Sequence, residues 1–65
     1  MEEEKKLSVI IHHWIEHNES HIVEYRRWAQ KAGELGLAGV SKEIEDAIDK
    51  LLQCNDNLKK AMKGI

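Results

Sequence analysis

Two long segments with a helical repeat of apolar residues, separated by one glycine-rich stretch, constrain this chain more than any other feature. The 65 residues contain no proline, so no residue of that kind breaks a helix in either segment. In the first segment apolar residues recur at about 100° per residue, the period of an α-helix. The residues on that stripe are Leu7, Ile10, Ile11, Trp14, Asn18, His21, Ile22, Tyr25, Trp28, Ala29 and Ala32.

The second segment has a heptad-like repeat, with apolar residues at alternating steps of three and four from Leu37 to Ile65. Such a repeat is typical of helices that pack lengthwise. The sequence therefore predicts an all-α fold, an antiparallel helical hairpin that forms a single domain over residues 1–65. We expect the first helix over about residues 3–32 and the second from residue 37 or 41 to about residue 63.

The ends of the helices carry local signals. Gly33 or Gly36 can supply the left-handed residue that closes the first helix. Ser41 is a candidate N-cap of the second helix. Leu37 and Val40, however, continue the apolar repeat backwards and favour the earlier start. The two possible starts remain open at this point.

A hairpin of this length cannot cover its largest apolar side chains. A 65-residue chain buries only about 60% of the surface that it exposes when unfolded. A single cysteine, Cys54, rules out an internal disulfide bond. Trp14, Tyr25 and Trp28 are too large to hide against one partner helix. We therefore expect a homodimer, in which two hairpins form a four-helix bundle with these aromatic residues in its core.

Composition excludes several classes of protein. Hydrophobic residues make up 42% of the chain, which is too many for a disordered protein. The net charge of −2, with acids and bases interspersed, provides no field for phosphates, so we expect no nucleic-acid partner. No apolar run is long enough to cross a membrane. One unpaired cysteine suits a reducing compartment, and we expect a cytoplasmic location.

Polar residues interrupt the apolar stripes of both helices. Asn18 and His21 lie within the first stripe and Asn55 lies within the second. If the turn centres near Gly36, Asn18 and Asn55 fall at the same level of the hairpin. A buried amide or imidazole without a partner costs about 1–3 kcal/mol. One interpretation is therefore a hydrogen-bonded layer that fixes helix register and dimer geometry without any ligand.

A second interpretation is a metal site. His17 and His21 are four residues apart, so a helix projects both imidazoles from one side, and neutral imidazole suits zinc, nickel, cobalt or copper. Asn18 and Asn55 would orient the ligands. The full candidate ligand set is His13, His17, His21, Glu24 and Cys54. This interpretation makes the chain a small binding protein for a transition-metal ion.

Two further alternatives are an enzyme and a cofactor-binding protein. A histidine, Cys54 and an aspartate could form a nucleophilic triad, and Glu16 or Glu24 could serve as a base. A 65-residue hairpin, however, has little room for a closed substrate pocket. We therefore expect no enzyme. Trp14 and Trp28 could instead flank a flat cofactor such as haem.

The stretch from His13 to His21, which contains His17, Asn18 and His21 in an HNxxH pattern, resembles a small prokaryotic helical domain. The resemblance continues through Glu24, Ala29, Ala47 and Leu58. It implies a metal-associated function, carried here by His17, Asn18 and His21. This chain lacks the histidine-rich tract that accompanies the domain elsewhere, so the resemblance does not extend to metal storage.

Overall fold

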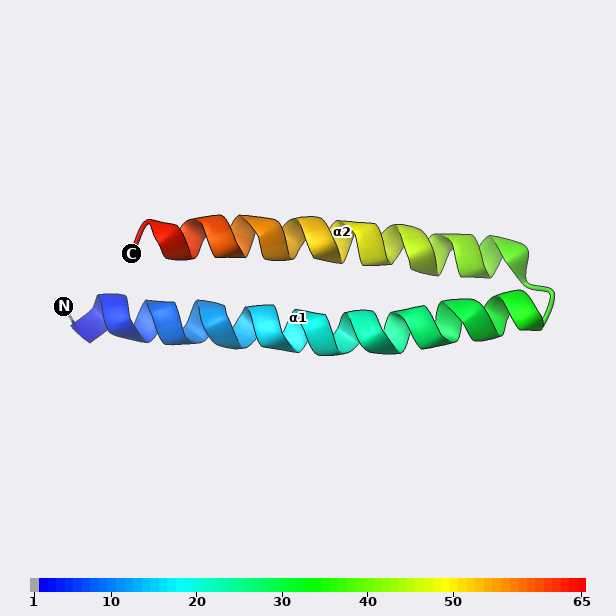
Figure 1. Ribbon diagram of the computed structural model, residues 1–65, viewed down its shortest axis with the longest axis horizontal. Coiled ribbons are helices and arrows are strands. Elements are labelled where there is room, and N and C mark those ends of the chain that lie inside the picture. The colour runs from blue at the N-terminus through cyan, green and yellow to red at the C-terminus, as the bar shows by residue number, and fades with distance from the viewer. Residues whose placement is uncertain (1) are drawn as a thin grey trace.

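The computed structural model describes residues 2–65, which form two antiparallel α-helices joined by a short turn (Figure 1). Helix α1 spans Glu2–Glu34 and helix α2 spans Ala38–Lys63. Both ends of the chain lie at the same end of the hairpin, where α1 extends beyond α2 (Figure 1). The predicted all-α hairpin is confirmed, and α1 is slightly longer at both ends than its apolar repeat indicated.

A glycine closes α1 and reverses the chain. Gly36 has a φ of 79°, in the left-handed region that side chains other than glycine rarely adopt. The Leu37 N–H donates to the Ala32 carbonyl at 2.9 Å, and the Gly36 N–H donates to the Gly33 carbonyl at 3.0 Å. This pair of hydrogen bonds is the Schellman motif. Gly36 rather than Gly33 is therefore the left-handed residue.

Helix α2 begins close to the earlier of its two predicted starts. Leu37 occupies the N-cap position and makes no side-chain capping hydrogen bond. The prediction of Ser41 as the N-cap is wrong, because Ser41 already lies inside the helix. Its hydroxyl donates across the hairpin to the Ala29 carbonyl at 2.7 Å. The Ser41 hydroxyl thus bonds to a carbonyl of α1 instead of capping α2. This hydrogen bond joins the two helices near the turn.

The core is a narrow seam between the helices. The buried residues of the described chain are Ile11, Ile15, Ile22, Ala29 and Ala32 on α1, and Ile48 and Asn55 on α2. Ile15 lies outside the predicted stripe, whereas Leu7, Ile10, Trp14 and Trp28 lie within that stripe and are exposed. One partner helix covers about two positions of each heptad. The stripe is wider than that, so part of it remains uncovered.

The hairpin is long and thin. Its principal extents are 53 × 15 × 10 Å, and its radius of gyration is 15.2 Å. A compact domain of this length has a radius of gyration of about 11 Å. The fold therefore leaves most of each helix on the surface.

Across residues 2–65, neither helix combines the length and apolar character needed to span a lipid bilayer.

Candidate functional site

A pair of amides joins the middle of the two helices. The Asn18 side chain on α1 donates from Nδ2 to Oδ1 of Asn55 on α2 at 2.8 Å. The Asn55 amide in turn donates to the Ile15 carbonyl at 3.3 Å. Asn55 is only 4% exposed, and Asn18 is partly buried. The prediction that these two asparagines meet at one level is confirmed, and their hydrogen bonds satisfy a polar group inside an apolar seam.

The structure separates His21 from that amide pair. His21 is exposed, as are His13 and His17, and residues 2–65 contain no hydrogen bond that links it to either asparagine. The prediction of a buried layer that includes His21 is therefore wrong for a single chain. His21 directly precedes the buried Ile22, and a step of one residue turns a side chain by about 100° around a helix, so His21 lies beside the seam rather than in it.

The histidines instead form a column along the outside of α1. The ring centroids of His17 and His21 are 4.5 Å apart in an edge-to-face arrangement. His13 stacks next to His17 at 6.3 Å, and Tyr25 extends the column at 5.9 Å from His21. His17 and His21 therefore have the spacing of two imidazoles that could share one ion.

The other candidate ligands do not join this column. No three of the histidine, cysteine and acidic side chains within residues 2–65 come close enough to hold a metal ion. Cys54 lies next to the amide pair, where Asn18 Nδ2 approaches its sulfur at 3.7 Å. Glu24 is exposed on α1. The five-residue ligand set therefore does not assemble in one chain, and Cys54 belongs to α2 whereas the other four candidates belong to α1.

The two tryptophans lie far from each other along α1. Trp14 and Trp28 are fourteen residues apart, which places them about 21 Å apart along the helix axis. His17 and His21 lie between them on the same helix.

A broad apolar surface, which we name the tryptophan face, runs along one side of the hairpin. Most of its residues recur at seven-residue steps along each helix, beside the buried seam. The others lie next to these residues. They are Leu7, Ile10, Trp14, His17, His21, Tyr25 and Trp28 of α1, Leu35 directly after α1, and Val40, Ala47, Cys54 and Ala61 of α2. Trp14 is 48% exposed and Trp28 is 53% exposed. An apolar hollow on this face is shared by both helices and includes Tyr25, Val40 and Ala47 in its lining.

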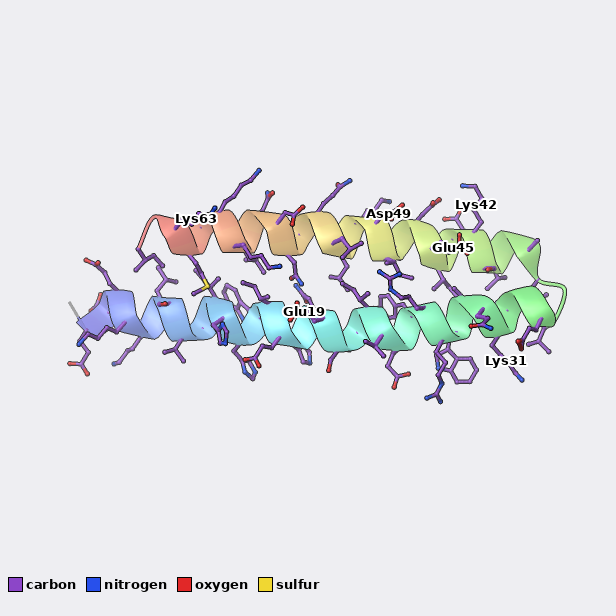
Figure 2. The ribbon with its side chains drawn as sticks, in the orientation of Figure 1. Glu19, Lys31, Lys42, Glu45, Asp49 and Lys63 are labelled. Atoms are coloured by element: carbon purple, nitrogen blue, oxygen red, sulfur yellow. The ribbon has the colours of Figure 1, made fainter. Side chains whose placement is uncertain are left out.

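The opposite side, which we name the charged face, differs in character. On this side, the residues that recur at steps of seven are Lys5, His12, Glu19 and Arg26 on α1, and Glu45, Leu52 and Lys59 on α2. His12 Nε2 lies 3.3 Å from Glu16 Oε1, with both side chains open to solvent. Charged side chains also project from the outer edges of the hairpin, where Lys31 points away from α2 and Lys42 points away from α1 (Figure 2). The hairpin is therefore amphipathic as a whole unit.

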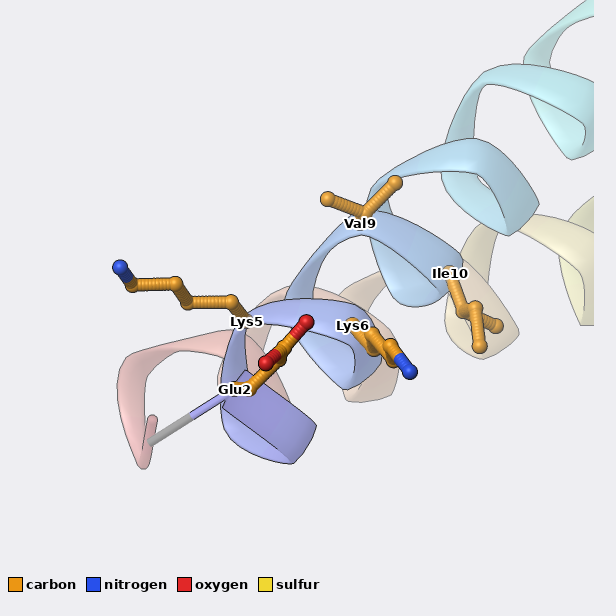
Figure 3. Close-up of a pocket in the computed structure, with 5 residues that line it drawn as sticks. All are labelled: Glu2, Lys5, Lys6, Val9 and Ile10. Carbon is orange, nitrogen blue, oxygen red and sulfur yellow. The ribbon is translucent and has the colours of Figure 1, made fainter.

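A second hollow lies beside the first turns of α1 (Figure 3). Its lining residues are Glu2, Lys5, Lys6, Val9 and Ile10, all from one helix. No α2 residue closes it, because α1 extends beyond the end of α2 there (Figure 1). It lacks a second wall to hold a ligand, which leaves the tryptophan face and its histidines as the candidate site.

The sequence contains a signal for this face that a single wide stripe obscures. Three of the five buried residues of α1, namely Ile15, Ile22 and Ala29, follow one another at steps of seven residues. Residues offset from that repeat by one position, such as Trp14 and Trp28, must then lie beside the seam rather than in it. Treating the buried series and the offset series separately identifies Ile15 as a core residue and the tryptophan face as an exposed surface.

Comparison with known proteins identifies a family but no activity. A family model described as "Domain of unknown function (DUF8180)" matches residues 7–65. No curated protein and no solved structure matches the chain. The matched range includes α1 from Leu7 onward, all of α2, the amide pair and the tryptophan face.

Proposed function

We propose, from the premise that this chain belongs to the DUF8180 family of domains of unknown function, that it is a self-associating helical module. Two hairpins pack through their tryptophan faces and form a four-helix bundle. The proposal assigns the partner as a second copy of the chain. The single free cysteine fits a reducing compartment, so we also propose a cytoplasmic location.

The exposed area is the observation that carries this proposal. The hairpin exposes 5223 Å². A folded monomer of 7.5 kDa exposes roughly 4,200 Å². The excess of about 1,000 Å² is comparable to the roughly 800 Å² that each partner buries in a stable interface. A second copy packed on the tryptophan face would remove an area of that size.

The distribution of side chains indicates which surface is covered. Trp14, Tyr25 and Trp28 all lie on the tryptophan face. Tryptophan and tyrosine are the residues most enriched among those that dominate binding energy at interfaces. The opposite face has charged residues in the corresponding positions, and these favour contact with water. Self-association therefore uses one face of the hairpin and leaves the other in solvent.

Sedimentation equilibrium tests this proposal with a matched pair of variants. Wild type is expected to be a dimer at a chain concentration of about 100 μM, because an interface of this size commonly gives micromolar affinity or better. Trp28→Glu places a charge in the interface and is expected to give a monomer. Val23→Glu changes a residue that is 69% exposed outside the tryptophan face and is expected to remain dimeric. A monomeric wild type, or equal effects of the two variants, would refute the proposal.

Transition-metal binding is a second candidate function, favoured by the His17–His21 centroid separation of 4.5 Å. Zinc, nickel, cobalt and copper all accept neutral imidazole ligands. Equilibrium dialysis should then show metal uptake by wild type and no uptake by the His17→Ala/His21→Ala double variant. His12→Ala is the matched control, because His12 lies on the charged face beside Glu16. Negligible uptake by all three proteins would reject this function.

A further inference from the structure

The tryptophan face contains a row of residues whose two halves mirror each other. At seven-residue steps, the row is Leu7, Trp14, His21 and Trp28 of α1 and Leu35 of the turn that follows it. Read in either direction, it has the same side chains in the same order. A two-fold axis that crosses α1 at His21 would place Trp14 of one copy opposite Trp28 of an antiparallel second copy. Self-complementarity of this kind is what a symmetric interface requires.

The row on α2 has its centre within about half a helical turn of the level of His21. It consists of Val40, Ala47, Cys54 and Ala61, again at seven-residue steps. The Asn18–Asn55 hydrogen bond sets the register of the two helices. Because the helices are antiparallel, one turn beyond Asn18 on α1 corresponds to one turn before Asn55 on α2. Ala47 and Cys54 therefore flank the level of His21, and one axis relates both rows to their copies.

The shape of the tryptophan face is consistent with a two-fold axis at His21. Trp14 of the second copy would lie at the level of Trp28, beside the apolar hollow that Tyr25 and α2 line. The α2 residues of the row are small or β-branched, so they leave room for an indole. Large side chains from one copy would thus meet open apolar surface on the other, as close packing at an interface demands.

We propose that this axis builds a transition-metal site between two copies, in which His17 and His21 of both chains bind one divalent ion. The inference rests on the proposed self-association. Packed helices lie about 8–10 Å apart, which brings histidines beside a two-fold axis within reach of a common ion. Zinc takes four ligands in a tetrahedron, with Zn–N distances of about 2.0–2.1 Å. One chain contributes two imidazoles, and the second copy completes the set.

The position of the histidines on an apolar face supports this site. His21 lies between the exposed Trp14 and Trp28 in the row, and His17 lies next to His21, so a second copy on this face would remove water from both imidazoles. Unlike the Asn18–Asn55 pair, their rings have no hydrogen-bond partner among residues 2–65. A polar group that becomes buried needs a partner, and a shared ion satisfies four imidazoles at once.

Calorimetric titration with zinc, combined with sedimentation equilibrium, tests the inference on the full chain. We expect one zinc ion for every two chains. His21→Ala and His17→Ala should each weaken zinc affinity by at least about tenfold, whereas His12→Ala should not change it. Trp28→Glu retains all four histidines of the chain but should weaken affinity about 100-fold, because the second pair of ligands is no longer held nearby.

The outcomes separate the inference from the proposed function. A chain that is monomeric with and without zinc overturns the self-association and the shared site together. A dimer in chelator that takes up no zinc, or one ion per chain, overturns the shared site and leaves the self-association intact. Zinc binding that survives in the His17 and His21 variants also overturns the shared site. One ion per two chains, lost in Trp28→Glu, supports it.

Discussion

The seam between the two helices and the tryptophan face beside it are both apolar stripes interrupted by polar groups near mid-length. In the seam, the Asn18 and Asn55 amides bond to each other and to the Ile15 carbonyl. On the tryptophan face, His17 and His21 contact each other edge to face in the open. The seam is complete within one chain, whereas the face has polar groups that one chain does not satisfy. The comparison separates residues that hold the hairpin together from residues that our proposal assigns to an interface with a second copy.

The largest expected effect lies in the seam. Ile22→Ala removes a buried side chain and should lower the free energy of unfolding by about 2–5 kcal/mol. A small domain has only about 5 kcal/mol in total, so the variant should retain at most about 3 kcal/mol. Urea denaturation followed by circular dichroism measures the loss.

Val23→Ala is the neighbouring control. Val23 is exposed outside both stripes, and its truncation should change stability by no more than about 0.5 kcal/mol. If the two alanine variants were equally stable, the seam would not be the core of the hairpin.

A smaller effect is expected from the amide pair. Asn55→Ala leaves the Asn18 amide without its partner and should lower the free energy of unfolding by about 1–3 kcal/mol. Asn57→Ala, at an exposed position on the same helix, should be close to neutral. Urea denaturation again measures both variants.

Replacing both asparagines sharpens this result. Asn18→Leu/Asn55→Leu should recover or exceed wild-type stability, because apolar groups can replace a satisfied buried pair. The same variant should lose its unique register, visible as multiple signals in an amide NMR spectrum. A single set of sharp signals would show that the amide pair does not specify register.

The smallest effect on the fold is expected on the tryptophan face. His21→Leu replaces an exposed imidazole with an apolar side chain, so the melting temperature of the metal-free protein should stay the same or rise. Calorimetry in chelator measures it. A clear fall in melting temperature would mean that His21 contributes to the fold itself, which would erase the distinction between the two stripes.

Much of the fold follows from residue patterns alone. Two uninterrupted repeats and Gly36 predict a hairpin, and equal spacing from the turn predicts the meeting of Asn18 and Asn55. The start of α2 could not be decided in this way, since Ser41 has the chemistry of an N-cap. Its hydroxyl bonds to the Ala29 carbonyl instead, a partner twelve residues away that only the packed hairpin brings near.

The candidate site was less predictable than the fold. His17 and His21 share one side of α1, as any helix requires for residues four apart. Their separation from the asparagines depends on how α1 is rotated toward α2. A rotation that faced Trp14 inward would have buried His21 beside Asn55. Small buried residues such as Ala29 and Ala32 let the helices approach closely, and that approach leaves no room for an indole in the seam.

Local chemistry along the chain determined the helices, the position of the turn and the level at which the asparagines meet, because each depends on backbone geometry and residue spacing. The tertiary structure alone decided which part of the wide apolar stripe became core and which became surface. A single partner helix covers only a strip of its neighbour, and the strip that packs most closely becomes the core. Ile15 was buried and Trp14 was left exposed for that reason.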